Sequence, residues 1–123
     1  MRGRVIAGLG CRRGCSMDDI LLVLRRTGTE VAAIAVPAFK ADEPGVREAA
    51  RVLGLPVIRV DDAALARAQS RCETHSNAAK RATGFASIAE GCALAACGPN
   101  GRLTLARIAA GGATCALAQE MPA

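Results

Sequence analysis

A glycine-rich segment at residues 8–16 carries the residue types with the clearest potential for chemistry. It reads Gly-Leu-Gly-Cys-Arg-Arg-Gly-Cys-Ser and joins an apolar run to a segment with helical spacing. Glycines let ligand atoms approach the backbone, and the amides at a helix N-terminus favour an anion. Arginine adds forked donors that match carboxylate or phosphate. We therefore predict an anion site here, with ligand-binding residues Gly8, Gly10, Cys11, Arg12, Arg13, Gly14 and Ser16.

Two alternatives to a carboxylate site stay open for this segment. A nucleotide- or phosphate-binding module is one of them, although the glycine spacing is one residue longer than the dinucleotide fingerprint. The Lys-Ser/Thr pair of a phosphate-binding loop is also missing. The other alternative is a tight turn with solvated arginines, in a structural subunit that has no ligand.

Lys40 and Glu43 form the second candidate, in the loop after a fully apolar run. Lys40 is one of only two lysines, and its ammonium group would neutralise a carboxylate or assist a proton transfer. Glu43 would act as a base or would simply support the start of the next helix. A solvated loop explains the same residues equally well.

The third candidate lies between Thr83 and Glu90. Ser87 precedes Glu90 by three positions, which is the spacing of a capping box, and this interpretation is favoured. In the functional alternative, Gly84 and Ser87 bind a second anion and Glu90 is catalytic.

Apolar patterning indicates how these residues are positioned. Alternation of strands and helices predicts an α/β fold of three layers, α/β/α, with a mixed, mostly parallel sheet of about five strands. Ligands on such sheets bind beyond the carboxyl ends of the strands, where the first two candidates fall. Residues 70–83 are predicted to be a mobile loop. Strands are expected at 4–9, 31–36, 55–60, 102–108 and 113–117, and helices at 17–27, 44–53, 63–69 and 88–97.

Composition limits the classes of partner. The 123 residues suit a single domain, residues 1–123, and the net charge of +5 favours an anionic partner. Nucleic acid is disfavoured because the chain has two phenylalanines and no Trp or Tyr for base stacking. No apolar run is long enough to span a membrane, and no signal peptide is evident, so we expect a cytoplasmic protein. The six cysteines lack metal-ligand spacing, so we expect no metal and no cofactor.

Taken together, the three segments resemble the CobE and CbiG C-terminal-domain family of cobalamin biosynthesis. Residues 8–16, 40–57 and 83–96 carry the resemblance, in the same order and along nearly the whole chain. It implies a three-layer α/β/α domain that acts in the corrin-ring branch of the pathway. Members fused to a further N-terminal region are associated with opening the δ-lactone of cobalt-precorrin-5A and releasing acetaldehyde, whereas this chain is similar to the free-standing form. Cys15 departs from the pattern, which has a small hydroxyl residue there.

The resemblance implies a protein that binds a polycarboxylate precorrin or corrin intermediate, with other enzymes of the pathway as possible partners. Two roles stay open: an enzyme related to cobalt-precorrin-5A hydrolase, and a non-catalytic carrier. In the hydrolase, Glu43 or Glu90 would activate water, and Lys40 would stabilise developing negative charge. Arg12 would hold a peripheral carboxylate in either role.

Overall fold

The computed structural model describes residues 3–121, in which five strands form one mixed sheet. The strand order is β3-β2-β1-β5-β4; β1, β2 and β3 are parallel, β5 is antiparallel to β1, and β4 is antiparallel to β5. Four strands therefore share a direction, which confirms the mixed, mostly parallel sheet. The strands are β1 (Val5–Cys11), β2 (Ala33–Pro37), β3 (Val57–Val60), β4 (Arg102–Ala110) and β5 (Ala113–Gln119).

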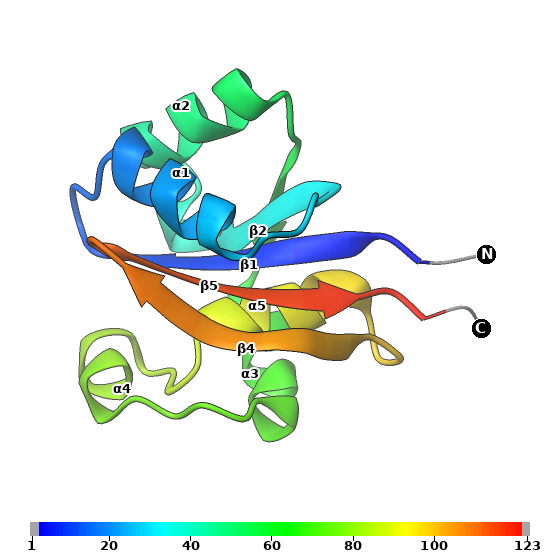
Figure 1. Cartoon of the computed structure of the whole chain (residues 1–123). Coiled ribbons are helices and arrows are strands. Elements are labelled where there is room, and N and C mark those ends of the chain that lie inside the picture. The colour runs from blue at the N-terminus through cyan, green and yellow to red at the C-terminus, as the bar shows by residue number, and fades with distance from the viewer. Residues whose placement is uncertain (1–2, 122–123) are drawn as a thin grey trace.

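Helices cover both faces of this sheet (Figure 1). Helices α1 (Met17–Arg26) and α2 (Pro44–Leu53) pack on one face, in a cluster that includes Leu9 of β1. Helices α3 (Asp62–Ala68) and α5 (Ala89–Cys97) pack on the other, in a cluster that includes Ile6. Because side chains alternate along a strand, neighbouring residues of β1 serve opposite layers. The predicted three-layer arrangement is confirmed.

Glycine on β1 lets α5 lie very close to the sheet. A Cβ atom at Gly8 would overlap the carbonyl oxygen of Ala89 and lie 2.6 Å from the backbone nitrogen of Ala93. Ala89 and Ala93 on the facing side of α5 allow this close approach. The close contact fixes where the first turn of α5 stands relative to the end of β1.

Several predicted boundaries are wrong, and two of the differences concern residues 70–83 and the end of β1. Residues 70–83 are not simply a loop, because they hold part of the short 3-10 helix η2 (Gln69–Arg71) and the whole of helix α4 (Asn77–Thr83). The Ser76 hydroxyl accepts a hydrogen bond from the Ala79 amide and so caps α4. Strand β1 also continues two residues beyond Leu9, because Gly10 and Cys11 pair with the start of β5.

An arginine closes the C-terminal end of α5. The guanidinium of Arg71 donates to the carbonyl oxygens of Leu94 at 3.5 Å and Gly98 at 3.2 Å. It also donates to those of Pro99 at 3.2 Å and Gly101 at 3.1 Å. Carbonyls at a helix end have no partners within the helix, and a cation is favourable there. Arg71 therefore joins η2 to the turn after α5.

We expect Arg71→Met to lower the free energy of unfolding by about 2 kcal/mol, since several charged hydrogen bonds are lost while the aliphatic stem stays. Urea denaturation followed by circular dichroism measures the change. Arg67→Met is the matched control, because Arg67 is exposed on α3 and makes no side-chain hydrogen bond within residues 3–121. Equal stability of the two variants would contradict a capping role for Arg71.

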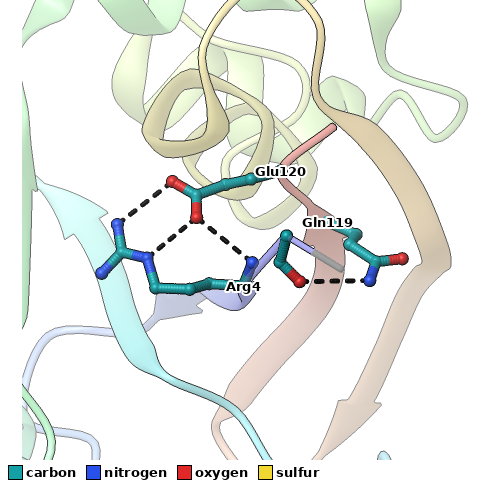
Figure 2. Close-up of polar contacts among 4 residues, drawn as sticks. Arg4, Gln119 and Glu120 are labelled. Carbon is teal, nitrogen blue, oxygen red and sulfur yellow. Dashed lines mark hydrogen bonds and ion pairs between the residues drawn. The ribbon is translucent and has the colours of Figure 1, made fainter. Parts of the chain in front are cut away.

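The start of β1 is joined to the end of β5 at the end of the sheet far from Cys11 (Figure 2). Arg4 Nε donates to Glu120 Oε1 at 2.8 Å and Nη2 to Oε2 at 3.1 Å, and Gln119 donates to the Gly3 carbonyl. The hydrogen bond from Arg4 lowers the pKa of Glu120. The pair is exposed to solvent, so its contribution to stability is small.

No helix within residues 3–121 is long and apolar enough to cross a membrane.

Candidate functional site

An open pocket of about 730 Å³ lies at the carboxyl ends of β1, β2 and β4. Four segments line it: the β1–α1 turn, the 3-10 helix η1 (Ala38–Lys40) after β2, the β4–β5 hairpin, and parts of residues 74–90. This is the edge of the sheet at which the topology predicts a ligand. Its volume is in the range of small-molecule sites.

Four cationic side chains line this pocket: Arg12, Arg13, Lys40 and Arg107. They come from the β1–α1 turn, η1 and β4. Within residues 3–121, no carboxylate lies within 4.0 Å of the three guanidinium groups. Lys40 lies 3.5 Å from Glu43 Oε1, and each of these two side chains is about 20% exposed. The pocket thus presents an excess of positive charge, which favours a polyanion.

Glu90 is the one carboxylate among the lining residues, and its hydrogen bonds are already made. It is 1% exposed; Oε1 accepts from the amides of Glu73 at 2.7 Å and Thr74 at 2.8 Å, and Oε2 accepts from the Arg107 amide at 2.9 Å. Burial raises the pKa of Glu90, but these bonds outweigh it and hold the pKa below its ordinary value of 4.5. Glu90 therefore joins α5 to residues 73–74 and to β4 as an ionised carboxylate.

The predicted capping box of Ser87 and Glu90 is wrong. Helix α5 begins at Ala89, and its N-cap is Ile88, which has no side-chain cap. Glu90 contacts other segments instead, as described above. The Ser87 backbone is held on both sides by Gln69, which accepts from the Ser87 amide at 3.0 Å and donates to its carbonyl at 2.8 Å. Sequence reasoning missed Gln69, because a lone amide 18 residues away gives no local signal.

The Ser87 side chain is 4% exposed, and its hydroxyl has no hydrogen-bond partner within residues 3–121. Burial raises the pKa of the nearby Cys72 to about 11, and Ser87 opposes this rise. The two groups are therefore close, although they do not have hydrogen-bond geometry.

Part of the pocket is lined by an apolar wall. It consists of alanines 78, 79 and 82 on α4, with Ala86 and Ile88 after it, and it also includes the half-exposed ring of Phe39 on η1. Small aliphatic side chains make a smooth surface on which a flat apolar body can pack. The pocket thus combines cations with an aliphatic wall.

The expected anion site at the start of α1 is not supported by the structure. The Ser16 hydroxyl accepts from the Asp19 amide at 3.1 Å, and Asp19 Oδ2 accepts from the Ser16 amide at 3.4 Å. This capping box places a carboxylate of the protein at the helix N-terminus, where it opposes a second anion. Ser16 lines a separate groove of about 300 Å³ together with Gly14 and Glu43.

The structure divides the predicted site residues into two sets. Gly8 packs beneath α5, and Gly84, with φ of 87°, ends α4 in the left-handed conformation. Neither of these glycines lines the pocket. Gly14, Ser16 and Glu43, which line the separate groove, do not line it either. Arg107 was not predicted, because only the folded hairpin brings it to this edge. The predicted residues that do line the pocket are Gly10, Cys11, Arg12, Arg13, Lys40, Ser87 and Glu90.

The thiols near the pocket are not assembled for metal binding. Burial, together with the contact with Cys11, raises the pKa of Cys15 to about 12, so Cys15 is protonated at neutral pH. Within residues 3–121, no three side chains of the types His, Cys, Asp and Glu come together as a candidate metal site.

Comparisons with known proteins place the chain among cobalamin-biosynthesis proteins. Residues 5–118 match the family model described as cobalamin synthesis G C-terminus. The crystal structure of CobE, a protein from the cobalamin (vitamin B12) biosynthetic pathway, is similar with a TM-score of 0.88 and 36% identity, over 97% of this chain and 92% of that one. The cobalamin biosynthesis protein chiG from Agrobacterium tumefaciens str. C58 is similar with a TM-score of 0.75 and 36% identity, over 93% and 96% of the two chains. No match was found among curated protein sequences.

Proposed function

The chain belongs to the cobalamin synthesis G C-terminal family, and from this premise we propose that its pocket binds a polycarboxylate precorrin or corrin intermediate. Such a ligand has a broad macrocycle with acidic side arms around it. One observation carries the proposal: four cations and an aliphatic wall line the same pocket, and its carboxylate, Glu90, is already hydrogen bonded.

Each part of the pocket suits one part of this ligand. Guanidinium groups of Arg12, Arg13 and Arg107 are free to bind acetate or propionate arms in a forked geometry. The alanines of α4 offer aliphatic contact to the macrocycle, in a protein with no Trp or Tyr to stack on it. A neutral ligand would leave the cations uncompensated, so the acidic arms determine affinity.

Binding without catalysis is the role that the geometry supports better than lactone hydrolysis. A carboxylate that activates water needs an oxygen free to take a proton. Both oxygens of Glu90 accept backbone hydrogen bonds, and Glu43 lines the other groove and pairs with Lys40. Lys40 would exchange its contact with Glu43 for one with an acidic arm. We therefore propose a carrier of the intermediate, and treat the lactonase as the role to be excluded by experiment.

We expect Arg12→Gln and Arg107→Gln each to raise the dissociation constant for hydrogenobyrinic acid about tenfold, which corresponds to one lost charged contact of about 1.4 kcal/mol. Both side chains are exposed, and glutamine keeps the Arg107 amide that bonds to Glu90, so the variants fold. Isothermal titration calorimetry measures the affinities, and Arg67→Gln on α3 is the control. Unchanged affinity in both pocket variants, or tighter binding of ATP or NAD, would overturn the proposal.

The choice between carrier and hydrolase has its own experiment. The purified protein is incubated with the lactone intermediate, and acetaldehyde is measured with an alcohol dehydrogenase and NADH. A carrier binds the intermediate without releasing acetaldehyde. Catalytic release that Lys40→Met abolishes would establish the hydrolase instead.

A further inference from the structure

Helix α4 stands apart from the hydrophobic core. None of its residues is buried, and none of residues 73–84 belongs to the three clusters of packed apolar side chains. Figure 1 shows α4 on the same side of the sheet as α3 and α5, at the end of the molecule where the turn of the β4–β5 hairpin lies. A segment with so little apolar burial is free to move on its own.

Both ends of the segment that carries α4 are nevertheless firmly held. On the N-terminal side, Glu90 accepts from the amides of Glu73 and Thr74. On the C-terminal side, both amide atoms of Gln69 hold the Ser87 backbone. A backbone hydrogen bond of 2.8 Å from Ser76 to the Ala86 carbonyl closes the base of the loop between these points.

Between these anchors, residues 76–84 form a unit with its own internal bonds, whereas the next residue, Phe85, packs against the core cluster that includes Ile6. The Ser76 hydroxyl caps the first turn of α4, and Gly84 ends the helix. The Thr83 hydroxyl donates to the Ala79 carbonyl at 2.7 Å and accepts from the Phe85 amide at 3.1 Å. The cap of α4 and the bond from Thr83 to Ala79 stay intact if this unit rotates as one body while Phe85 keeps its place against the core.

The two faces of this unit differ in chemistry. The face toward the pocket consists of Ala78, Ala79, Ala82 and Thr83, at the spacing of a single helical face. The residues that do not line the pocket include Asn77, Lys80 and Arg81. A polar outer face and an alanine inner face suit a cover that is wet on one side and packed against a ligand on the other.

We propose that residues 76–84 are a lid that closes over the macrocycle bound in the pocket, with Glu90 and Gln69 as its positioning residues. This inference rests on the proposed function, since the bound corrin supplies the apolar surface that α4 lacks in the free chain. Closure buries the three alanines against the ring and leaves the acidic arms to Arg12, Arg13, Lys40 and Arg107. A lid of this kind would shield the intermediate from solvent during transfer.

Hydrogen exchange of the intact chain, followed by mass spectrometry, tests the lid. In the free protein, we expect amides of α4 to exchange at least 100-fold faster than those of α5, because α4 opens without unfolding the core. Saturating hydrogenobyrinic acid is expected to slow the α4 amides at least tenfold. Slow exchange of α4 in the free chain, or binding that leaves α4 unchanged, would overturn the lid and leave the proposed function standing. Failure of the acid to bind would remove both.

A pair of variants separates lid closure from the general effect of charge. Ala82→Glu places a carboxylate on the inner face, where closure would bury it against the ligand, and we expect the ligand to dissociate at least tenfold faster. Asn77→Glu adds the same charge to a residue of α4 that does not line the pocket, and we expect less than a twofold change. Both positions are exposed in the free chain, so both variants fold. Equal dissociation rates in the two variants would overturn the lid.

Discussion

Replacing Glu90 with glutamine is expected to lower the free energy of unfolding by about 3 kcal/mol near neutral pH, a large effect for a change of one atom. The carboxylate accepts three backbone hydrogen bonds in a site that is 1% exposed. A glutamine amide has one oxygen, so its NH₂ group must face a backbone N–H. In the better orientation the Arg107 amide faces the NH₂ group and loses its acceptor.

The cost of this replacement should depend on pH. The pKa of Glu90 in the folded chain lies below its ordinary value of 4.5, so the folded state holds the ionised form more firmly than the unfolded state does. The stabilisation is therefore complete above that value and is lost as pH falls through the folded pKa. We expect urea denaturation to show a large difference in the free energy of unfolding between wild type and Glu90→Gln at about pH 7, and a smaller difference at about pH 3.

Glu73→Gln is the matched control for this prediction, because the Glu73 side chain is exposed and its contribution to the Glu90 site is its backbone amide. This variant should keep wild-type stability within about 0.5 kcal/mol. A difference in the free energy of unfolding between wild type and Glu90→Gln that stays constant across pH would contradict the claim that Glu90 is an ionised, hydrogen-bonded carboxylate. It would also remove the N-terminal anchor of the proposed lid.

The layers and most elements of the fold could be predicted because their signals are local. Apolar runs, Ser16 before α1 and Gly54 after α2 each act on neighbouring residues, and their elements form as expected. Helix α4 was missed because its seven residues bury no side chain, and three alanines on one face give too weak an apolar signal to indicate a helix. The extra residues of β1 were missed because their partners lie about 100 positions away, on β5.

The candidate site was predictable only where a single segment carries it. The β1–α1 turn and Lys40 reach the pocket because parallel strands end at the same edge. The spacing of Ser87 and Glu90 predicted a capping box, but tertiary contacts outweigh local ones. The amides of residues 73, 74 and 107 have their side-chain acceptor only because Glu90 turns toward them. Gly8 was predicted to contact a ligand because it lies in a glycine-rich segment. In the structure, helix α5 occupies the space beside it where a side chain would stand.

The largest loss of stability is expected from Gly8→Ala, about 4 kcal/mol, because overpacking against backbone atoms leaves no flexible side chain to yield. The new Cβ atom would overlap the carbonyl oxygen of Ala89 and lie within 3 Å of both the nitrogen and the Cβ of Ala93. Helix α5 would have to move away from β1, and Glu90 would move with it. Urea denaturation measures the loss, and hydrogenobyrinic acid binding should weaken as well, because Ile88 and Ala89 line the pocket.

Gly14→Ala separates this steric effect from the conformational freedom of glycine. Gly14 has φ of 77°, and a Cβ atom there would meet nothing within 4 Å, so alanine costs only the left-handed backbone, about 1 kcal/mol. If Gly8 served the ligand through its backbone, Gly8→Ala would weaken binding and leave stability unchanged. If Gly8 serves the packing of α5, Gly8→Ala lowers both the free energy of unfolding and the affinity for the ligand, and Gly14→Ala changes each of them little. Equal free energies of unfolding for Gly8→Ala and Gly14→Ala would contradict the close packing of α5 on β1. The part of the pocket wall formed by the first turn of α5 would then also be placed wrongly.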